Sequence, residues 1–168
     1  MEAIKLVSKY LNISAGSLCY NTDKVLTTVI DKENVEGFVS IILRLISKSG
    51  IKMSQEQMLL SYQWLEHIAM YANQAYSNPA FAKNFLQGMN RALQKKSYLT
   101  GNLLTVTDIA AFYVVYSLVE RLTVQEQESL LHLCRWCKNI QAQPRVCASR
   151  APLPLNTLTL SILAPAVH

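Results

Sequence analysis

Apolar residues recur at helical spacing along most of the chain, and this pattern divides near Ser49-Gly50, where a helical segment stops at a glycine of the kind that ends helices. Before this point the spacing predicts a helix over Ala3–Leu11, a β-branched strand over Val25–Ile30 and a second helix over Phe38–Ile46. Residues 1–50 are therefore predicted to form a small α/β lobe.

From residue 51 to residue 147 every segment has a helical period, and the helix starts carry their own capping residues. Ser54 with Gln57 three positions later is a capping box, which opens a helix that reaches about Tyr76. Asn78-Pro79 sets a capping side chain before a proline at the first helical position, and the helix that follows is expected to end near Lys96. This part is predicted to be an all-helical domain.

The segment 105–108, Thr-Val-Thr-Asp, is the strongest local signal in the chain. We predict that Thr105 and Asp108 are structural N-cap residues, because their side chains can pair with the amides that a first helical turn leaves free. From Ile109 to Val119 the helix is apolar nearly all round, which is typical of a helix enclosed by others. Loss of the Asp108 cap is expected to cost about 0.5 to 2 kcal/mol, without a specific binding defect.

A further helical segment begins at Thr123 with Glu126, and its apolar stripe continues until Pro144 ends it. The remainder of the chain, residues 148–168, has three prolines, no charge after Arg150 and no clear period. We interpret it as an extended, partly ordered apolar tail.

Composition narrows the class of protein. The chain has 168 residues, 51% of them apolar and 16% charged, which allows one sizeable core or a core with a small lobe. Its four cysteines are too few to indicate a disulfide scaffold and fit a cytoplasmic chain. Met1–Leu11 lacks the apolar run of a secretory signal, and Ile109–Val119 is shorter than the roughly 18 to 20 residues that span a bilayer. We expect a cytoplasmic protein that is not in a membrane, with a nuclear fraction left open.

Three short motifs, in this order, resemble the glutathione S-transferase fold: Trp64-Leu65-Glu66, Tyr98-Leu99-Thr100-Gly101 and Arg135-Trp136. The run Leu122-Thr123-Val124-Gln125-Glu126 narrows the resemblance to the elongation factor 1 epsilon-1 family within that superfamily. The resemblance covers about residues 50 to 145. It implies a mainly α, glutathione S-transferase-like fold, in which a reduced thioredoxin-like lobe precedes an all-α domain.

The same resemblance implies a function without catalysis. Members of this family are scaffold proteins of the multi-aminoacyl-tRNA synthetase complex, and they bind the transferase-like domains appended to methionyl- and glutamyl-prolyl-tRNA synthetases. It therefore implies these two enzymes as partners and no cofactor. A homodimer of the isolated chain is a further alternative, because transferase-like domains pair with themselves through the same faces.

Glutathione chemistry is the alternative that the residues argue against. A transferase presents its backbone to glutathione through a cis proline, and this chain has no proline before Pro79. Glu36-Gly37 stands where a transferase has a capping serine, and its carboxylate would repel that of the ligand. A diverged transferase with an atypical thiol site would have to use one of the hydroxyls or thiols near the N-terminus, namely Ser8, Tyr10, Ser14, Ser17, Cys19 or Tyr20.

Cys134 and Cys137 have the C-x-x-C spacing of redox and zinc sites, with His132 and Cys147 nearby in sequence. A redox pair works at a helix N-terminus, whereas this pair is expected well inside a helix with both sulfurs on the apolar stripe. Structural packing is therefore our interpretation of both cysteines, and no metal is expected.

Arg135, His132 and Asn139 should share the outer face of the same helix and form a polar surface that binds a partner. The plainer alternative is an Arg135 that is solvated or paired within its own domain. A second docking surface is expected where the last helix of the first lobe meets the opening helix of the second domain. Its candidate residues are Arg44, Tyr62, Glu66 and Tyr71. Direct nucleic-acid binding is not expected, because Lys95-Lys96 alone is too short a phosphate track.

Overall fold

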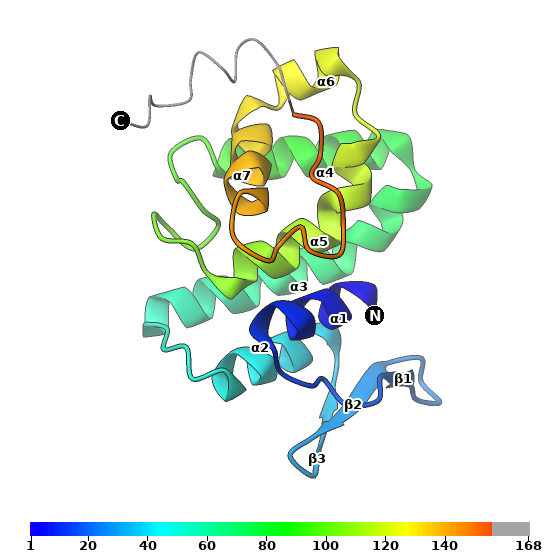
Figure 1. Cartoon of the computed structure of the whole chain (residues 1–168). Coiled ribbons are helices and arrows are strands. Elements are labelled where there is room, and N and C mark those ends of the chain that lie inside the picture. Colours follow the sequence, from blue (N-terminus) through cyan, green and yellow to red (C-terminus); the bar gives the residue numbers. More distant parts are fainter. Residues whose placement is uncertain (156–168) are drawn as a thin grey trace.

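The computed structural model describes residues 1–155, in which a small lobe is followed by a larger helical part (Figure 1). The lobe contains α1 (Glu2–Leu11), β1 (Cys19–Tyr20), β2 (Leu26–Ile30), β3 (Glu33–Glu36) and α2 (Phe38–Lys48). The sheet is antiparallel with order β1-β2-β3, and Thr28 of β2 lies opposite Val35 of β3. The sequence predicted β2 correctly apart from its first residue, but not β1 or β3.

The helical part follows the loop after α2. It contains α3 (Gln55–Ser77), α4 (Pro79–Ala92), α5 (Val106–Glu120), α6 (Val124–Ser129) and α7 (Leu131–Gln141). Capping side chains begin three of these helices as expected: the Ser54 and Thr123 boxes precede α3 and α6, and Asn78 Oδ1 accepts from the amides of Ala80 and Phe81. The mainly α fold with one small α/β lobe is thus confirmed.

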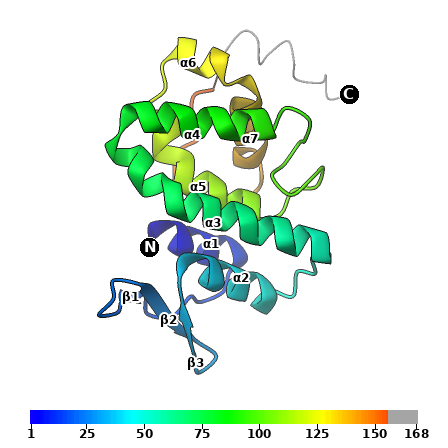
Figure 2. The same cartoon turned by 180° about the vertical axis from the view of Figure 1, so that it is seen from behind.

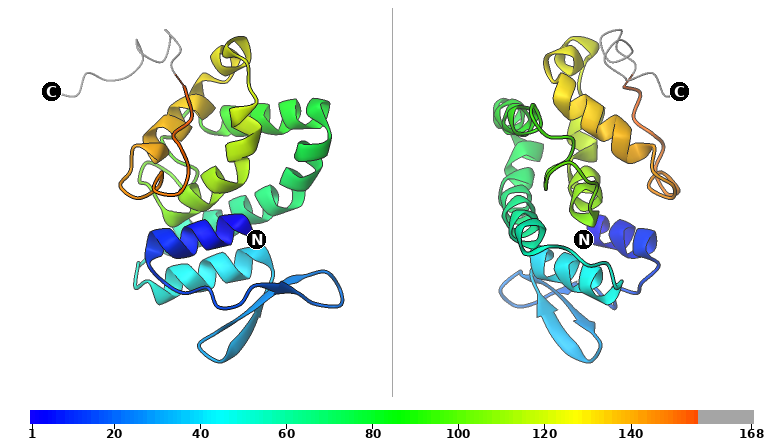
Figure 3. Two further views of the ribbon diagram at one scale, coloured as in Figure 1. Left: turned by 45° about the vertical axis from the view of Figure 1, so that its right-hand side comes forward. Right: turned by 90° about the vertical axis from the view of Figure 1, so that its left-hand side faces the viewer.

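The core is continuous through both parts of the molecule. α5 lies at its centre, where twelve of its fifteen residues are buried, and packs against α1, α3 and α7. α1 lies between α2 and the helical part (Figure 3). The view from behind shows α3 and α4 crossing in front of α5 (Figure 2). None of the helices within residues 1–155 has the length and hydropathy needed to cross a membrane.

Two helix ends differ from the expectation. α4 stops at Ala92, one turn before Lys96, because Arg135 of α7 donates to the carbonyl oxygens of Leu93 and Lys96 and stabilises a turn there. The helix expected from Thr123 to Pro144 is two helices, since Leu130 leaves helical geometry with φ −118° and ψ 40°. The buried Leu130 side chain fills the corner between α6 and α7.

The segment after α7 forms a strap, residues 142–155, that crosses α5. Tyr113 donates to the carbonyl of Val146 (2.9 Å) and Tyr116 donates to that of Ala151 (2.8 Å). Leu153 is buried, so the first part of the expected tail packs against the core. The rest of that tail, residues 156–168, lies outside the described residues.

Candidate functional site

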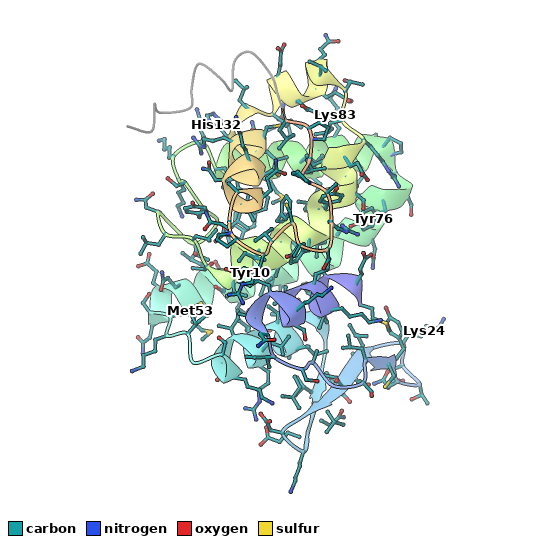
Figure 4. All side chains as sticks on the ribbon, viewed as in Figure 1. Tyr10, Lys24, Met53, Tyr76, Lys83 and His132 are labelled. Atoms are coloured by element: carbon teal, nitrogen blue, oxygen red, sulfur yellow. The ribbon has the colours of Figure 1, made fainter. Side chains whose placement is uncertain are left out.

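A cleft of about 520 Å³ lies between residues of the first lobe and residues of the helical part, a place where proteins commonly bind small ligands. Lys24 and Val25 of the β1–β2 hairpin, Gly37 before α2, Tyr76 of α3 and Arg150 of the strap contribute to its walls. Figure 4 shows Lys24 and Tyr76 on the same side of the molecule. The size would suit a small ligand, so the chemistry of the walls decides what the cleft can do.

These walls lack the features of a glutathione site. Every peptide bond within residues 1–155 is trans, so the cleft has no cis-proline backbone to present. α2 begins after Gly37, whose φ of 86° suits glycine, and no side chain caps this helix start. Of the six candidate hydroxyls and thiols, Tyr20 lines the cleft, with 59% of its surface exposed. Water competes for the hydroxyl of so exposed a phenol and weakens any hydrogen bond by which it could stabilise a thiolate.

The C-x-x-C pair lies closer to a helix start than expected, because α7 begins at Leu131. Both sulfurs are nevertheless buried in the core, and burial raises the pKa of Cys134 to about 11 and that of Cys137 well above its usual range. Burial therefore outweighs the favourable position near a helix N-terminus and keeps both thiols protonated. Within residues 1–155 no three His, Cys, Asp or Glu side chains gather closely enough to hold a metal ion.

Arg135 lies beside the α4–α5 connection and bonds within its own chain. Its Nη2 atom donates to the carbonyls of Leu93 (2.7 Å) and Lys96 (2.9 Å). The expectation of a guanidinium that projects freely outward is therefore corrected in part. His132 and Asn139, one turn away on either side, are half-buried, and Figure 4 shows His132 at the outer end of α7. The three residues remain candidates for partner binding, with Arg135 held in a fixed orientation.

The second surface was expected where α2 meets α3, and two of its four candidate residues, Tyr62 and Glu66, lie on an outward stripe of α3. Large apolar side chains dominate it, with exposed fractions of 59% for Leu59, 50% for Tyr62 and 65% for Met70. Glu66 falls on the same stripe by helical spacing and is half-buried. We call these four residues the α3 face. Leu59 and Met70 were not predicted from the sequence. Tyr62, Glu66 and Met70 follow Leu59 by three, seven and eleven residues, and this helical spacing could have placed all four on one face.

Two of the predicted docking residues lie away from that stripe. Tyr71 points toward α4, with its ring 4.9 Å from that of His67 and 5.9 Å from that of Phe81. It belongs to an aromatic cluster between α3 and α4, so its predicted place on the outer surface is corrected. Arg44 of α2 forms an exposed ion pair with Glu33 of β3 at 2.6 Å. Such a pair contributes little to stability and can exchange for a partner's carboxylate.

Asp108 is fully buried and joins three elements. Its Oδ2 accepts from the Thr105 amide (3.0 Å) and hydroxyl (2.9 Å) at the start of α5. Its Oδ1 accepts from the Leu99 amide (2.8 Å) and from Trp136 Nε1 of α7 (3.0 Å). Burial raises the pKa of the carboxyl, and these hydrogen bonds partly oppose the shift. The sequence indicated the cap, but not the links to Leu99 and Trp136.

The model of a family described as "Nuclear-export cofactor Arc1p", with an Arc1p N-terminal-like signature, matches residues 58–144. This chain belongs to the Arc1p N-terminal-like family. The match begins within α3 and runs through α7, so it includes the α3 face, the Arg135 surface and the Asp108 site, but not Arg44.

Curated relatives place this Arc1p-like chain beside eukaryotic translation elongation factor 1 epsilon-1. It is 27% identical to the Homo sapiens protein over 150 residues, which is 85% of this chain and 86% of the relative. The Mus musculus protein is 25% identical over the same length. The resemblance found in the sequence is thereby confirmed.

A solved structure shows which fold the Arc1p-like chain has. The apo theta class glutathione S-transferase of Xanthomonas axonopodis pv. citri superposes with a TM-score of 0.63 at 13% identity, covering 92% of this chain and 91% of the other. The glutathione S-transferase-like fold predicted from the motifs is thus confirmed. At this identity the likeness concerns the fold alone.

Proposed function

We propose that this protein is a non-catalytic adaptor in translation, which holds other proteins through the outer faces of a transferase-like body. Its similarity to elongation factor 1 epsilon-1 and to the Arc1p cofactor family supports the translational role. The observation that carries the adaptor role is the α3 face, where Leu59, Tyr62 and Met70 leave half or more of their surfaces exposed on one helix. Large apolar side chains gathered in this way are typical of protein interfaces.

The proposed partners are the transferase-like domains of methionyl- and glutamyl-prolyl-tRNA synthetases. In this proposal the surface around Arg135, with His132 and Asn139, binds the glutamyl-prolyl domain, and the α3 face with Arg44 binds the methionyl domain. The fixed guanidinium of Arg135 suits this role, because an arginine that is already ordered loses less entropy on binding. The proposal places the protein in the cytoplasm, with a nuclear fraction and without direct contact to nucleic acid.

Binding of purified domains tests the proposal. We expect each synthetase domain to co-elute with the full chain in size exclusion with mass detection. Tyr62→Glu should remove the methionyl domain, because it buries a charge in an apolar interface, and should leave the glutamyl-prolyl domain bound. Arg135→Ala should do the reverse. Unchanged binding of both domains by both variants would refute the assignment of the two surfaces.

The isolated chain could use the α3 face for a second copy of itself. The same size-exclusion run measures its mass without partners, and Tyr62→Glu should convert any dimer to a monomer. If the methionyl domain dissociates the dimer, self-association and binding of the methionyl domain use the same residues of the α3 face.

A diverged transferase is the second candidate function, and the cleft of about 520 Å³ is the observation that favours it. Calorimetry with glutathione separates the two. We expect no saturable heat, because the cleft walls lack a cis-proline backbone and Gly37, which lines the cleft, has no side chain to cap the start of α2 for a ligand carboxylate. Saturable binding that Tyr20→Phe abolished would support the enzyme instead.

A further inference from the structure

Acidic residues are absent from two long stretches of the chain. None occurs between Glu66 and Asp108, although that stretch contains Lys83, Arg91, Lys95 and Lys96. None follows Glu128, although Arg135, Lys138, Arg145 and Arg150 do. Asp108 itself is buried, so its charge does not balance these cations at the surface. The basic excess of the chain is therefore concentrated in a few elements.

The fold brings the two stretches together. α4 packs against α7, and the Asn90 side chain accepts from the Leu133 amide at 3.0 Å. Two residues further along α7, Arg135 donates to the carbonyl of Lys96. The loop after α4 accordingly runs beside α7 (Figures 1 and 2). This arrangement forms what we call the cationic face, made of Arg91, Lys95, Lys96, Arg135 and Lys138.

The charges of the cationic face are not neutralised by the described part of the chain. The ion pairs found within residues 1–155 use Arg44, Lys48 and Arg150, all outside this face. Glu128 of α6 is the last acidic residue in the sequence before α7. Like charges on adjacent elements raise the local positive potential, and this potential attracts an acidic partner before contact is made.

The α3 face has the opposite character. Its exposed side chains are apolar apart from Glu66, so a partner there would gain mainly from removing apolar surface from water. Salt hardly weakens that gain, whereas it screens exposed charges beyond a distance of about 8 to 10 Å. Ionic strength should therefore act on one face and not on the other.

We propose that the two docking faces hold their partners by different forces, and that the cationic face takes an acidic protein surface. This inference rests on the adaptor function proposed above and adds the chemistry of the partner. Carboxylates of the partner engage Arg135, which is already oriented, while the surrounding lysines and Arg91 accelerate the approach. Salt then releases the partner on the cationic face and leaves the partner on the α3 face in place.

Two observations favour a protein over an RNA on this face. The large aromatic rings most exposed within residues 1–155 are Tyr20, Tyr62 and Tyr76, none of them on α7 or the α4–α5 connection, where the half-buried Tyr98 and His132 offer bases little ring surface for stacking. The face also has only a few cations, while affinity for nucleic acid grows with each phosphate neutralised. A fixed arginine among mobile lysines is better suited to a protein carboxylate.

The experiment measures association of the full chain with each purified synthetase domain at two salt concentrations. For the glutamyl-prolyl domain we expect the association rate to fall about tenfold between roughly 50 and 500 mM NaCl. Lys95→Glu with Lys138→Glu should lower the rate at low salt by about tenfold and remove most of the salt dependence. The control, Lys5→Glu with Lys32→Glu in the first lobe, makes the same change in net charge and should leave the rate within about threefold. Binding of the methionyl domain, whose proposed surface has Arg44 and Glu66 as its charged candidates, should depend much less on salt and should not respond to the reversal.

A probe that does not depend on the synthetases separates the two proposals. A labelled poly-glutamate peptide should bind the wild type at low salt and not the Lys95→Glu, Lys138→Glu variant, even if neither synthetase domain binds. In that case the adaptor partners would be wrong and the chemistry of the face would stand. If the glutamyl-prolyl domain binds and neither salt nor the Lys95→Glu, Lys138→Glu variant changes its association rate, the inference about the cationic face is overturned while the proposed adaptor function stands. A single-stranded RNA that binds more tightly than poly-glutamate, and is lost in the same variant, would also overturn it by assigning the face to nucleic acid.

Discussion

Asp108 offers a sharp test of the physical reasoning, because removing its carboxylate leaves specific donors without partners. In Asp108→Ala the Leu99 amide and Trp136 Nε1 both stay buried and lose their acceptor. A buried donor left unpaired costs about 1 to 3 kcal/mol, and loss of a helix cap costs about 0.5 to 2 kcal/mol. Asp108→Ala also removes a buried carboxylate, which is costly to desolvate, and this gain offsets part of the loss. We therefore expect a net destabilisation of about 3 kcal/mol, more than a cap alone would give.

Thermal unfolding followed by circular dichroism measures this effect. For a chain of this size, a loss of about 3 kcal/mol lowers Tm by roughly 6 to 12 °C. Asp108→Asn should fall between the alanine variant and the wild type, since its amide oxygen can still accept from Leu99 and Trp136. Its amide nitrogen, however, would face the Thr105 N–H as a second donor.

The chain contains a matched control in the α6 capping box. Glu126 Oε2 accepts from the Thr123 amide (2.9 Å) and hydroxyl (3.0 Å), which repeats the Thr105–Asp108 arrangement at the surface. In Glu126→Ala water can replace the lost acceptor, so Tm should move only slightly. If Asp108→Ala were no more destabilising than Glu126→Ala, the argument from buried donors would be refuted.

The same carboxylate gives a pH dependence with a definite sign. Burial raises its pKa in the folded state above the ordinary value of 3.8, so the folded protein binds this proton at a higher pH than the unfolded chain does. Between the raised pKa and 3.8, acidification therefore stabilises the wild type relative to Asp108→Asn, which has no such proton. Denaturant unfolding of both at neutral and mildly acidic pH should show a widening gap. A constant gap would mean that the pKa is not raised.

The remaining predictions concern cysteine reactivity and the strap. Under native conditions at pH 8 we expect iodoacetamide to label the exposed Cys19 first and to leave Cys134 and Cys137 unmodified, because burial raises the pKa of both thiols. Mass spectrometry of the digested protein measures the order of labelling, and early labelling of Cys134 would contradict the prediction. Gln141→Ala should cost about 1 to 3 kcal/mol in denaturant unfolding, because Gln141 bonds both the amide and the carbonyl of the buried Leu153 (2.9 and 3.0 Å). Gln141→Glu keeps the acceptor and should cost less; equal losses would show that the Leu153 amide does not depend on it.

Helix starts could be predicted from the sequence because their chemistry is local. Ser54, Asn78 and Thr123 each bond amides two or three residues away, so the motif contains the whole interaction. Helix ends were less predictable, as α4 shows. The carbonyls at its end are satisfied by Arg135, about forty residues further along the chain, and no local pattern reveals that partner.

The sheet and the candidate site show the same contrast. β3 reads Glu-Asn-Val-Glu, which has no apolar alternation, and it exists because β2 pairs with it across a short turn. Tyr62 and Glu66 could be placed on the docking stripe because the period of a helix determines which side chains share a face. Tyr71 could not be excluded in the same way, since its contact with Phe81 depends on where α4 lies.

The residues proposed for docking are largely separate from the buried core, and this explains how one small protein can serve as an adaptor. Its core is organised by α5 and the Asp108 hydrogen bonds, and the exposed residues of the α3 face and the lysines of the cationic face lie outside that packing. These residues can therefore vary with a partner at little cost to folding, whereas Arg135 also bonds the carbonyls of Leu93 and Lys96. The unpaired cations beside α7 repel one another and raise the free energy of the isolated chain. An acidic partner removes this repulsion when it binds, so the feature that slightly destabilises the free protein also strengthens the complex.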